Sequence, residues 1–246
     1  ILSFNGHMYV QGPILWDPDR DATLKRISDV PGVVTVAPLT ENAAMLRAMG
    51  QVTGGMVRGL RPQDLSGFPY VYESLSEEAR ASFGKGEWGG DNVLIGKTLA
   101  EQMGLRVGDP ISLYSPTGAD SAFGNLGGLE KTYIVGGIYT SGAADYDRAF
   151  VFMPLEQAQL FFGKEGIIDV VELKVAEPDK VEAMIGPVAR AAGQGALVTD
   201  WRNRQAAIWG ALKVERVAMS IILGMVVAIA AMNIISGIVM LVKNKT

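Results

Sequence analysis

The sequence contains no cysteine, only one histidine and no excess of positive charge. A chain without cysteine has no disulfides, no thiol catalysis and no thiolate metal sites. A single histidine excludes a metal site built from several histidines and argues against a histidine-dependent catalytic triad. The 22 Lys+Arg and 26 Asp+Glu residues give a net charge of -4, which argues against nucleic acid as a partner. The length of 246 residues allows one large domain or two small ones.

Apolar residues are concentrated near the C-terminus instead of being spread along the chain. Residues 217–242 contain no charged side chain, and about 20 apolar residues in a helix are enough to cross a bilayer core. Buried helices of soluble domains rarely extend this far without a charge, so the run predicts a transmembrane helix. Lys243 and Lys245 follow it and place residues 243–246 at the start of a cytoplasmic loop. We therefore expect the residues before the span to lie in the periplasm, as part of a longer bacterial inner-membrane protein with at least one further span upstream.

A second helix signal joins the external region to the predicted span. Asp200 is a suitable N-cap, and no proline follows it as far as Val242. Residues 201–242 are therefore expected to form one continuous helix of roughly 60 Å, with a periplasmic stalk at 200–216. Such a rod would couple movements in the membrane mechanically to the external domain.

The predicted span also carries small and polar side chains. Ser220, Gly224 and Ala228 recur every four residues, so they share one helical face that another helix can approach closely. Asn233 is polar within an apolar run, and we expect it to face protein rather than lipid. The pattern predicts that the membrane part packs as a bundle or a dimer.

The external region has strand and helix signals at both ends and a middle rich in glycine and aromatic residues. The two ends predict an α+β layer with strands at 7–11, 33–36, 168–175 and 197–198 and helices at 17–28, 154–162 and 178–192. The middle, residues 60–148, contains short alternating runs that are typical of strands, and we interpret it as an inserted, mostly β subdomain. Residues 40–49 have a helix-forming composition but lie between two predicted strands.

Three features resemble catalytic or ligand-binding motifs but fail in detail. Residues 90–98 look like a phosphate-binding loop, yet they have an extra residue between the glycines, and residues 93–95 are typical of a strand. Residues 17–28 begin like a calcium-binding loop but lack the glycine and the final glutamate that it requires. His7 is an isolated imidazole in a predicted strand, which favours a structural or exposed role over catalysis. We therefore predict no catalytic, metal-binding or cofactor-binding residues in this chain.

Several stretches of the sequence form a recognisable set: Gly6-His7, Val57-Arg58-Gly59-Leu60, residues 92–100 with 105–109, Asp200-Trp201-Arg202, and residues 231–246. This set resembles the permease subunits of the bacterial lipoprotein-releasing ABC transporter, the LolC/LolE group, and the resemblance covers essentially the whole chain. Parts of the set also occur in related MacB-type and FtsX-like permeases.

The resemblance implies a specific arrangement of subdomains. Residues 1–59 and 149–199 would form a porter-like α+β subdomain, and residues 60–148 an inserted, β-rich Sabre-like subdomain. The long helix that continues into the transmembrane span would follow. The resemblance also implies that residues 40–49 form a strand, against their composition.

The resemblance further implies a function and a set of partners. Permeases of this group extract acylated lipoproteins from the inner membrane and pass them to a periplasmic chaperone of the LolA type. Each permease pairs with a second one and works in contact with membrane lipid. ATP and Mg are bound by a dimer of separate cytoplasmic ATPase subunits, so this chain would not itself be an enzyme.

Two sets of site residues follow from the resemblance. A hairpin called the hook, which contacts the chaperone, would lie between Ser115 and Lys131. Its core would be Ala122, Phe123, Gly124, Asn125 and Leu126, where Ala122-Phe123 replaces a Thr-Pro pair that is frequent in the group. The acyl chains would lie beside the span, near Met219, Ile222 and Met225. Two alternatives stay open: a MacB-like exporter, and an FtsX-like adaptor that activates a periplasmic hydrolase.

Overall fold

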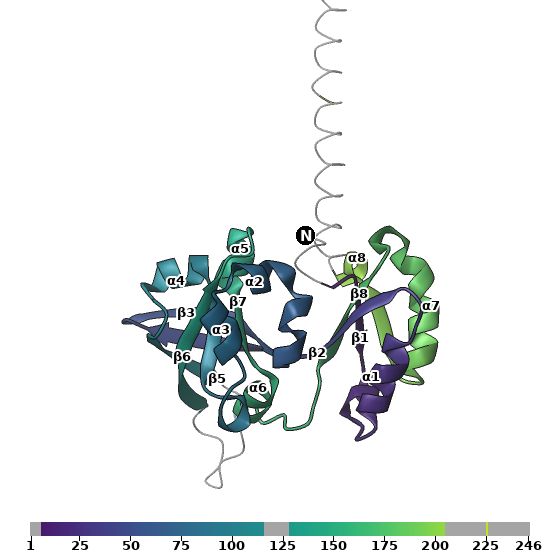
Figure 1. Ribbon diagram of the computed structural model, residues 1–246, viewed down its shortest axis with the longest axis horizontal. Helices are drawn as coiled ribbons and strands as arrows, with labels where there is room; N and C mark the ends of the chain where they lie inside the picture. Colours follow the sequence, from purple (N-terminus) through teal and green to yellow (C-terminus); the bar gives the residue numbers. More distant parts are fainter. Residues whose placement is uncertain (1–5, 116–127, 205–224, 226–246) are drawn as a thin grey trace, which may run out of the picture. The chain divides into compact units, whose positions relative to one another are not determined.

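The computed structural model describes residues 6–115, 128–204 and 225. The chain divides into two compact units, Ile1–Trp201 and Arg202–Thr246. The first unit is built on a nine-stranded sheet with helices packed against it (Figure 1). This mixture of helices and strands confirms the predicted α+β class.

One half of the first unit is an open sheet with the spatial order β2–β8–β1–β9. Strand β8 (Val170–Val175) lies between β1 (Met8–Gln11) and the N-terminal part of β2 (Val33–Ala48), and β9 (Leu197–Asp200) forms the edge beside β1. All three pairings are antiparallel. The strands predicted at 7–11, 168–175 and 197–198 are confirmed.

Two helices cover one face of this open sheet. They are α1 (Arg20–Ser28) and α7 (Val181–Ala192), each preceded by a short 3-10 turn, at Pro13–Trp16 and Pro178–Lys180. Apolar side chains of both helices pack against alternate residues of the strands; for β8 these are Val171, Leu173 and Val175. Because successive strand residues point to opposite faces, Glu172 lies on the face away from α1 and α7.

Strand β2 continues beyond the open sheet and pairs with β3 (Gln51–Leu60) through a two-residue turn at Met49–Gly50. Both turn residues have positive φ, as a tight hairpin with right-handed strand twist requires. The strand expected at 40–49 from the family resemblance is therefore confirmed. Leu46 is buried and its neighbour Met45 is exposed, so cross-strand pairing and the alternation of faces override the helix-forming composition.

The C-terminal part of β2 also closes a ring of strands, which we call the closed barrel. Its order is β2–β3–β7–β4–β6–β5 and back to β2. The pairs β3–β7 and β4–β6 are parallel and the others are antiparallel. The four strands not yet described are β4 (Asn92–Gly96), β5 (Pro110–Ser115), β6 (Leu129–Tyr139) and β7 (Phe150–Pro154).

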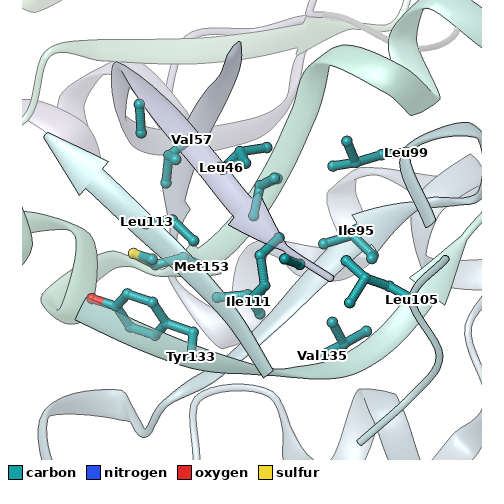
Figure 2. Close-up of a cluster of buried hydrophobic side chains, with 14 of the residues drawn as sticks. Leu46, Val57, Ile95, Leu99, Leu105, Ile111, Leu113, Tyr133, Val135 and Met153 are labelled. Carbon is teal, nitrogen blue, oxygen red and sulfur yellow. The ribbon is translucent and has the colours of Figure 1, made fainter. Parts of the chain in front are cut away.

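Side chains fill the inside of the barrel. Figure 2 shows ten labelled members of this core, which converge from the barrel strands, from α4 and from the segment after it: Leu46, Val57, Ile95, Leu99, Leu105, Ile111, Leu113, Tyr133, Val135 and Met153. Helix α4 (Lys97–Met103) and helix α6 (Leu155–Phe161) add side chains to the same core. They lie at opposite ends of this strand group in Figure 1, so each closes one end of the barrel.

The barrel strands differ in how many of their faces are buried. In β4 and β7, one set of residues faces the barrel core and the other set packs into a second core, which is shared with the open sheet. Short helical segments complete this shared core, at Pro62–Gly67, Pro69–Ser74 (α2), Glu77–Ser82 (α3) and Ala144–Ala149 (α5). A further 3-10 turn lies at Glu87–Gly89. The expectation of a mostly β structure at 60–148 was therefore wrong in its helix content, because these short helical segments were not predicted.

The closed barrel takes β2, β3 and β7 from ranges that the sequence assigned to the porter-like part. Because the barrel contains strands from both predicted parts, the division into subdomains at residues 60 and 148 remains a prediction. The helix expected after Asp200 begins at Trp201 and is described as far as Arg204 (α8). Among the described residues, no helix is both long and apolar enough to cross a membrane. The predicted span at 217–242 lies outside them except for Met225, which is helical and 61% exposed.

Candidate functional site: the hairpin of the closed barrel

Strands β5 and β6 form an antiparallel hairpin on the closed barrel. Their register runs from Pro110 opposite Ile134 to Ser115 opposite Leu129. The hairpin therefore extends to its last described pair without a shift, and the segment expected to form the hook joins these two ends. The hydroxyls of Ser112 and Thr132 share a hydrogen bond of 2.9 Å across it.

The outer face of this hairpin continues onto β2 and β3 and forms a shallow hollow. A space of about 330 Å³ is lined by Met45, Arg47, Val52, Tyr114 and Glu130. Met45 and Val52 are 48% and 56% exposed, and Arg47 forms an ion pair with Glu130 across the hollow. The hollow thus combines solvent-facing apolar side chains with one ion pair, a composition that suits contact with another macromolecule rather than catalysis.

A glycine allows the tyrosine of this hollow to lie over the neighbouring strand. A β-carbon added to Gly128 would come within 2.3 Å of the Ser115 carbonyl oxygen and 2.6 Å of the Tyr114 ring. Any larger residue at this position would displace the ring or the backbone of β5. The base of the hairpin is thus shaped by a residue without a side chain.

Lys131 fixes the hairpin to the rest of the barrel. Its Nζ lies 2.8 Å from a carboxylate oxygen of Asp91 and donates a 2.9 Å hydrogen bond to Gln157 of α6. The same ammonium group lies over the Tyr133 ring, 4.9 Å from its centroid. Burial, with a smaller contribution from the Asp91 carboxylate, raises the pKa of Tyr133. The phenol is therefore neutral at physiological pH.

His7 and Trp201, which are far apart in the sequence, meet on the open sheet. Trp201 donates its backbone N–H to the carbonyl oxygen of His7 at 3.2 Å. Nδ1 of His7 accepts a 3.0 Å hydrogen bond from the backbone N–H of Val175. His7 therefore joins Trp201 and β8 through hydrogen bonds, which is a structural role.

A family model matches most of this chain. Residues 4–190 match the model described as MacB-like periplasmic core domain. The chain belongs to the MacB-like periplasmic core domain family.

Curated members of the lipoprotein-releasing system are similar to this MacB-like chain over most of its length. The transmembrane protein LolC of Neisseria meningitidis serogroup B is 25% identical over 230 residues, which cover 93% of this chain and 54% of that protein. LolE of Haemophilus influenzae is 24% identical over 223 residues, which cover 90% and 52%. The chain thus spans about half the length of these relatives. They confirm the resemblance to the LolC/LolE group.

A solved structure shares the fold of this family member. The extracellular domain of YknZ, a noncanonic ABC-type transporter from Gram-positive bacteria, is 14% identical with a TM-score of 0.51. The match covers 80% of this chain and 100% of that one. At this identity the likeness shows the fold alone.

The predicted site residues fall almost entirely outside the described ranges. This applies to the hook residues Ala122, Phe123, Gly124, Asn125 and Leu126, and to the span residues Met219, Ser220, Ile222, Gly224, Ala228 and Asn233. What the structure adds is the hairpin base that flanks the predicted hook. Sequence reasoning missed the hollow at this base, because its residues come from four strands and only the register brings them together.

The phosphate-loop and calcium-loop lookalikes have structural explanations. Residues 93–95 lie within the buried strand β4, and Lys97, whose side chain is 59% exposed, begins α4 and faces Glu101 at 3.8 Å. The Asp17 carboxylate accepts a 2.9 Å hydrogen bond from the backbone of Asp19, just before α1 begins. Both motifs therefore start helices in the MacB-like fold.

Proposed function

We propose that this chain is the periplasmic region and second span of a permease subunit in an ABC transporter that releases acylated lipoproteins from the bacterial inner membrane. Its similarity to LolC and LolE over most of its length carries the proposal. The permease would pair with a second permease, and a cytoplasmic ATPase dimer would bind ATP and Mg. A LolA-like periplasmic chaperone would receive the lipoprotein.

The β5–β6 hairpin would carry the contact with the chaperone. Its tip, with the core Ala122–Leu126, would be the hook, and the adjoining hollow would offer a second contact at the hairpin base. The link from Lys131 to Asp91 and Gln157 supports this role, because it fixes the hairpin to the barrel. A hook on a fixed base would move with the whole unit.

Residues 201–242 would connect this unit to the membrane as one helix. Nucleotide-driven closure of the ATPases would move that helix, and the hydrogen bond from Trp201 to His7 would pass the movement to the open sheet. The acyl chains would lie near Met219, Ile222 and Met225, while Ser220, Gly224, Ala228 and Asn233 would pack against other helices. Each acyl methylene contributes about 0.8 kcal/mol to membrane anchoring, so release of several chains needs ATP turnover and a chaperone that rebinds them.

Photocrosslinking in cells tests the partner. A photoreactive residue at Phe123 is expected to capture a LolA-like chaperone, identified by mass spectrometry of the adduct. A probe at Leu197, an exposed apolar position on the edge strand β9, is the matched control and should not capture it. Capture of an export adaptor or a periplasmic hydrolase at Phe123 would replace this function with the MacB-like or FtsX-like alternative.

A break in the proposed rod tests the coupling. In a reconstituted transporter, Ala211→Pro is expected to abolish lipoprotein release while ATP is still hydrolysed, because proline interrupts a helix. Ala211→Ser preserves the helix and should retain release. Undiminished release by the proline variant would contradict the coupling.

A further inference from the structure

A cluster of charged side chains is buried where the open sheet meets the closed barrel. Arg58 of β3 is 2% exposed. Its Nε and Nη2 lie 2.8 and 2.6 Å from Oε1 of Glu41 on β2. Its Nη1 donates a 3.1 Å hydrogen bond to the hydroxyl of Tyr146 and lies 3.6 Å from Oε2 of Glu172 on β8. One guanidinium thus faces two carboxylates.

The two carboxylates are not equally well paired. Glu41 accepts the short hydrogen bonds from Arg58, whereas neither oxygen of Glu172 makes a hydrogen bond to a side chain in the part of the chain that the structure describes, and its nearest backbone support is Gly6. Glu172 is nevertheless only 2% exposed. A buried carboxylate whose nearest cation lies closer to a competing carboxylate is costly.

The titratable groups around Glu172 come from several elements. They are Arg58 on β3, Glu41 on β2, Tyr9 on β1, Tyr146 on α5, and Lys174 on its own strand. Burial raises the pKa of Glu172, and Glu41 adds to this rise. Arg58, Lys174 and a backbone hydrogen bond from Gly6 oppose it. Burial raises the pKa of Tyr146 to about 12, so this phenol stays neutral. Lys174 is half-buried, and burial lowers its pKa.

The cluster lies beside Gly6, the first residue that the structure describes. A β-carbon added to Gly6 would come within 2.2 Å of Cγ of Glu172, so the backbone of Gly6 rests on this side chain. Glu172 is also paired with Tyr9 of β1 in the open sheet. A shift of Gly6 and β1 would therefore act directly on Glu172, and through it on Arg58 of the barrel.

We propose that Glu172 is an unbalanced buried charge that keeps the joint between the open sheet and the closed barrel close to opening, so that movement of Gly6 and β1 separates Glu172 from Arg58. The role of this joint in transport rests on the proposed function. The energetic part stands on the geometry: Arg58 keeps its closer partner Glu41 when Glu172 is replaced. A neutral side chain of the same shape then removes the cost of burying a poorly paired charge.

Thermal unfolding of the whole 246-residue chain in detergent tests the energetic part. Glu172→Gln is expected to raise the Tm by about 2–4 °C, the shift that a stabilisation of about 1 kcal/mol produces in a chain of this size. Glu41→Gln is the matched control and should lower the Tm, because it weakens the closest partner of Arg58. Glu172→Met, which is apolar and of similar length, should also raise the Tm. A lower Tm in both Glu172 variants would overturn the proposal.

The pH dependence gives a second readout. A glutamate whose pKa is raised on folding stabilises the protein below its ordinary pKa, and this contribution is lost as the pH rises through the raised value. The wild-type Tm should therefore fall over that interval, and the Glu172→Gln variant should lack this part of the fall. Identical pH profiles of the two proteins would overturn the proposal.

Transport in the reconstituted complex separates the two hypotheses. Glu172→Gln is expected to lose lipoprotein release relative to wild type, because the joint opens less readily. Wild-type release rates in a variant with a higher Tm would overturn the role of the joint. A wild-type complex that releases no lipoprotein would instead refute the proposed function and leave the Tm result standing.

Discussion

The closed barrel and the open sheet share β2 but bury their apolar residues in different ways. The barrel encloses its core between strands, and α4 and α6 close its ends (Figure 1). The open sheet covers one face with α1 and α7 and turns the other toward a core that also contains the outer side chains of β4 and β7. The core inside the barrel therefore contains residues of the barrel half alone, whereas the second core contains residues of both halves.

This difference shows how one long strand can join two architectures into a single unit. The first part of β2 pairs with β8, and its last part with β5, while β3 runs along most of its length. The shared core and the buried Arg58 cluster then fill the angle between the halves. We therefore expect the two halves to unfold together.

Removing one large side chain from the barrel core, and one from the core between the open sheet and its helices, tests this expectation. These variants should have the largest effect on stability. Leu46 lies in the barrel and Leu173 in the open sheet, and both are fully buried. Leu46→Ala and Leu173→Ala should each cost about 2–5 kcal/mol of unfolding free energy. Hydrogen exchange during denaturation should show one transition for both halves in each variant. Loss of protection in one half only would show that the two halves unfold independently and would contradict this expectation.

Two glycines of the barrel should respond in opposite directions. A β-carbon at Gly96 would lie 2.1 Å from the Asp147 carbonyl oxygen, so Gly96→Ala should cost about 1–3 kcal/mol by forcing α5 away from β4. Gly54 of β3 has no atom within 4 Å of such a carbon, and its φ is not positive. Gly54→Ala should therefore stabilise the chain slightly, by about 0.4–1 kcal/mol. Chemical denaturation measures both, and equal effects would contradict the close approach at Gly96.

On the open sheet, His7 should contribute through its hydrogen bond with Val175. His7→Ala removes the acceptor for the backbone N–H of Val175, which should cost about 0.5–1.5 kcal/mol. His7→Asn, which restores an acceptor on a short side chain, should recover part of the loss. If asparagine and alanine are equally destabilising, the contribution of His7 is packing rather than hydrogen bonding.

The smallest effect is expected at the outer hollow of the barrel. The side chains of Arg47 and Glu130 are 60% and 42% exposed, and surface ion pairs contribute about 0.2–1 kcal/mol. Arg47→Ala should therefore change the unfolding free energy by no more than about 1 kcal/mol, while Arg47→Lys should be nearly neutral. A larger loss would mean that the hollow is part of the core that holds the barrel together.

Sequence patterns predicted those elements whose surroundings are simple. The helices α1, α6 and α7 were found because they carry clear start signals. The strands β1 and β8 were found as short, mainly apolar runs, and both faces of these strands are buried. The short strand β9 was found at residues 197–198. Strands β5 and β6 were recognised because their outer face is open, so polar and apolar residues alternate. The short helices α2, α3 and α5 were missed, because six-residue helices have too few turns to show a period.

The buried charges illustrate what a local reading misses. Arg58 and Glu172 each interrupt an apolar strand, and a charge in such a run was the available signal. Their partnership could not be read from spacing, since the two residues lie on strands that are far apart in the sequence. The hollow at Tyr114 was missed for the same reason.

By itself, the sequence determined the α+β class and the resemblance to the LolC/LolE group, because composition, periodicity and motifs are local properties of the chain. The tertiary structure alone decided that β2 belongs to two sheets, that the strands close into a barrel, and that one arginine serves two carboxylates. These features depend on strand register and on side-chain burial. Both are settled only when distant segments pack against one another.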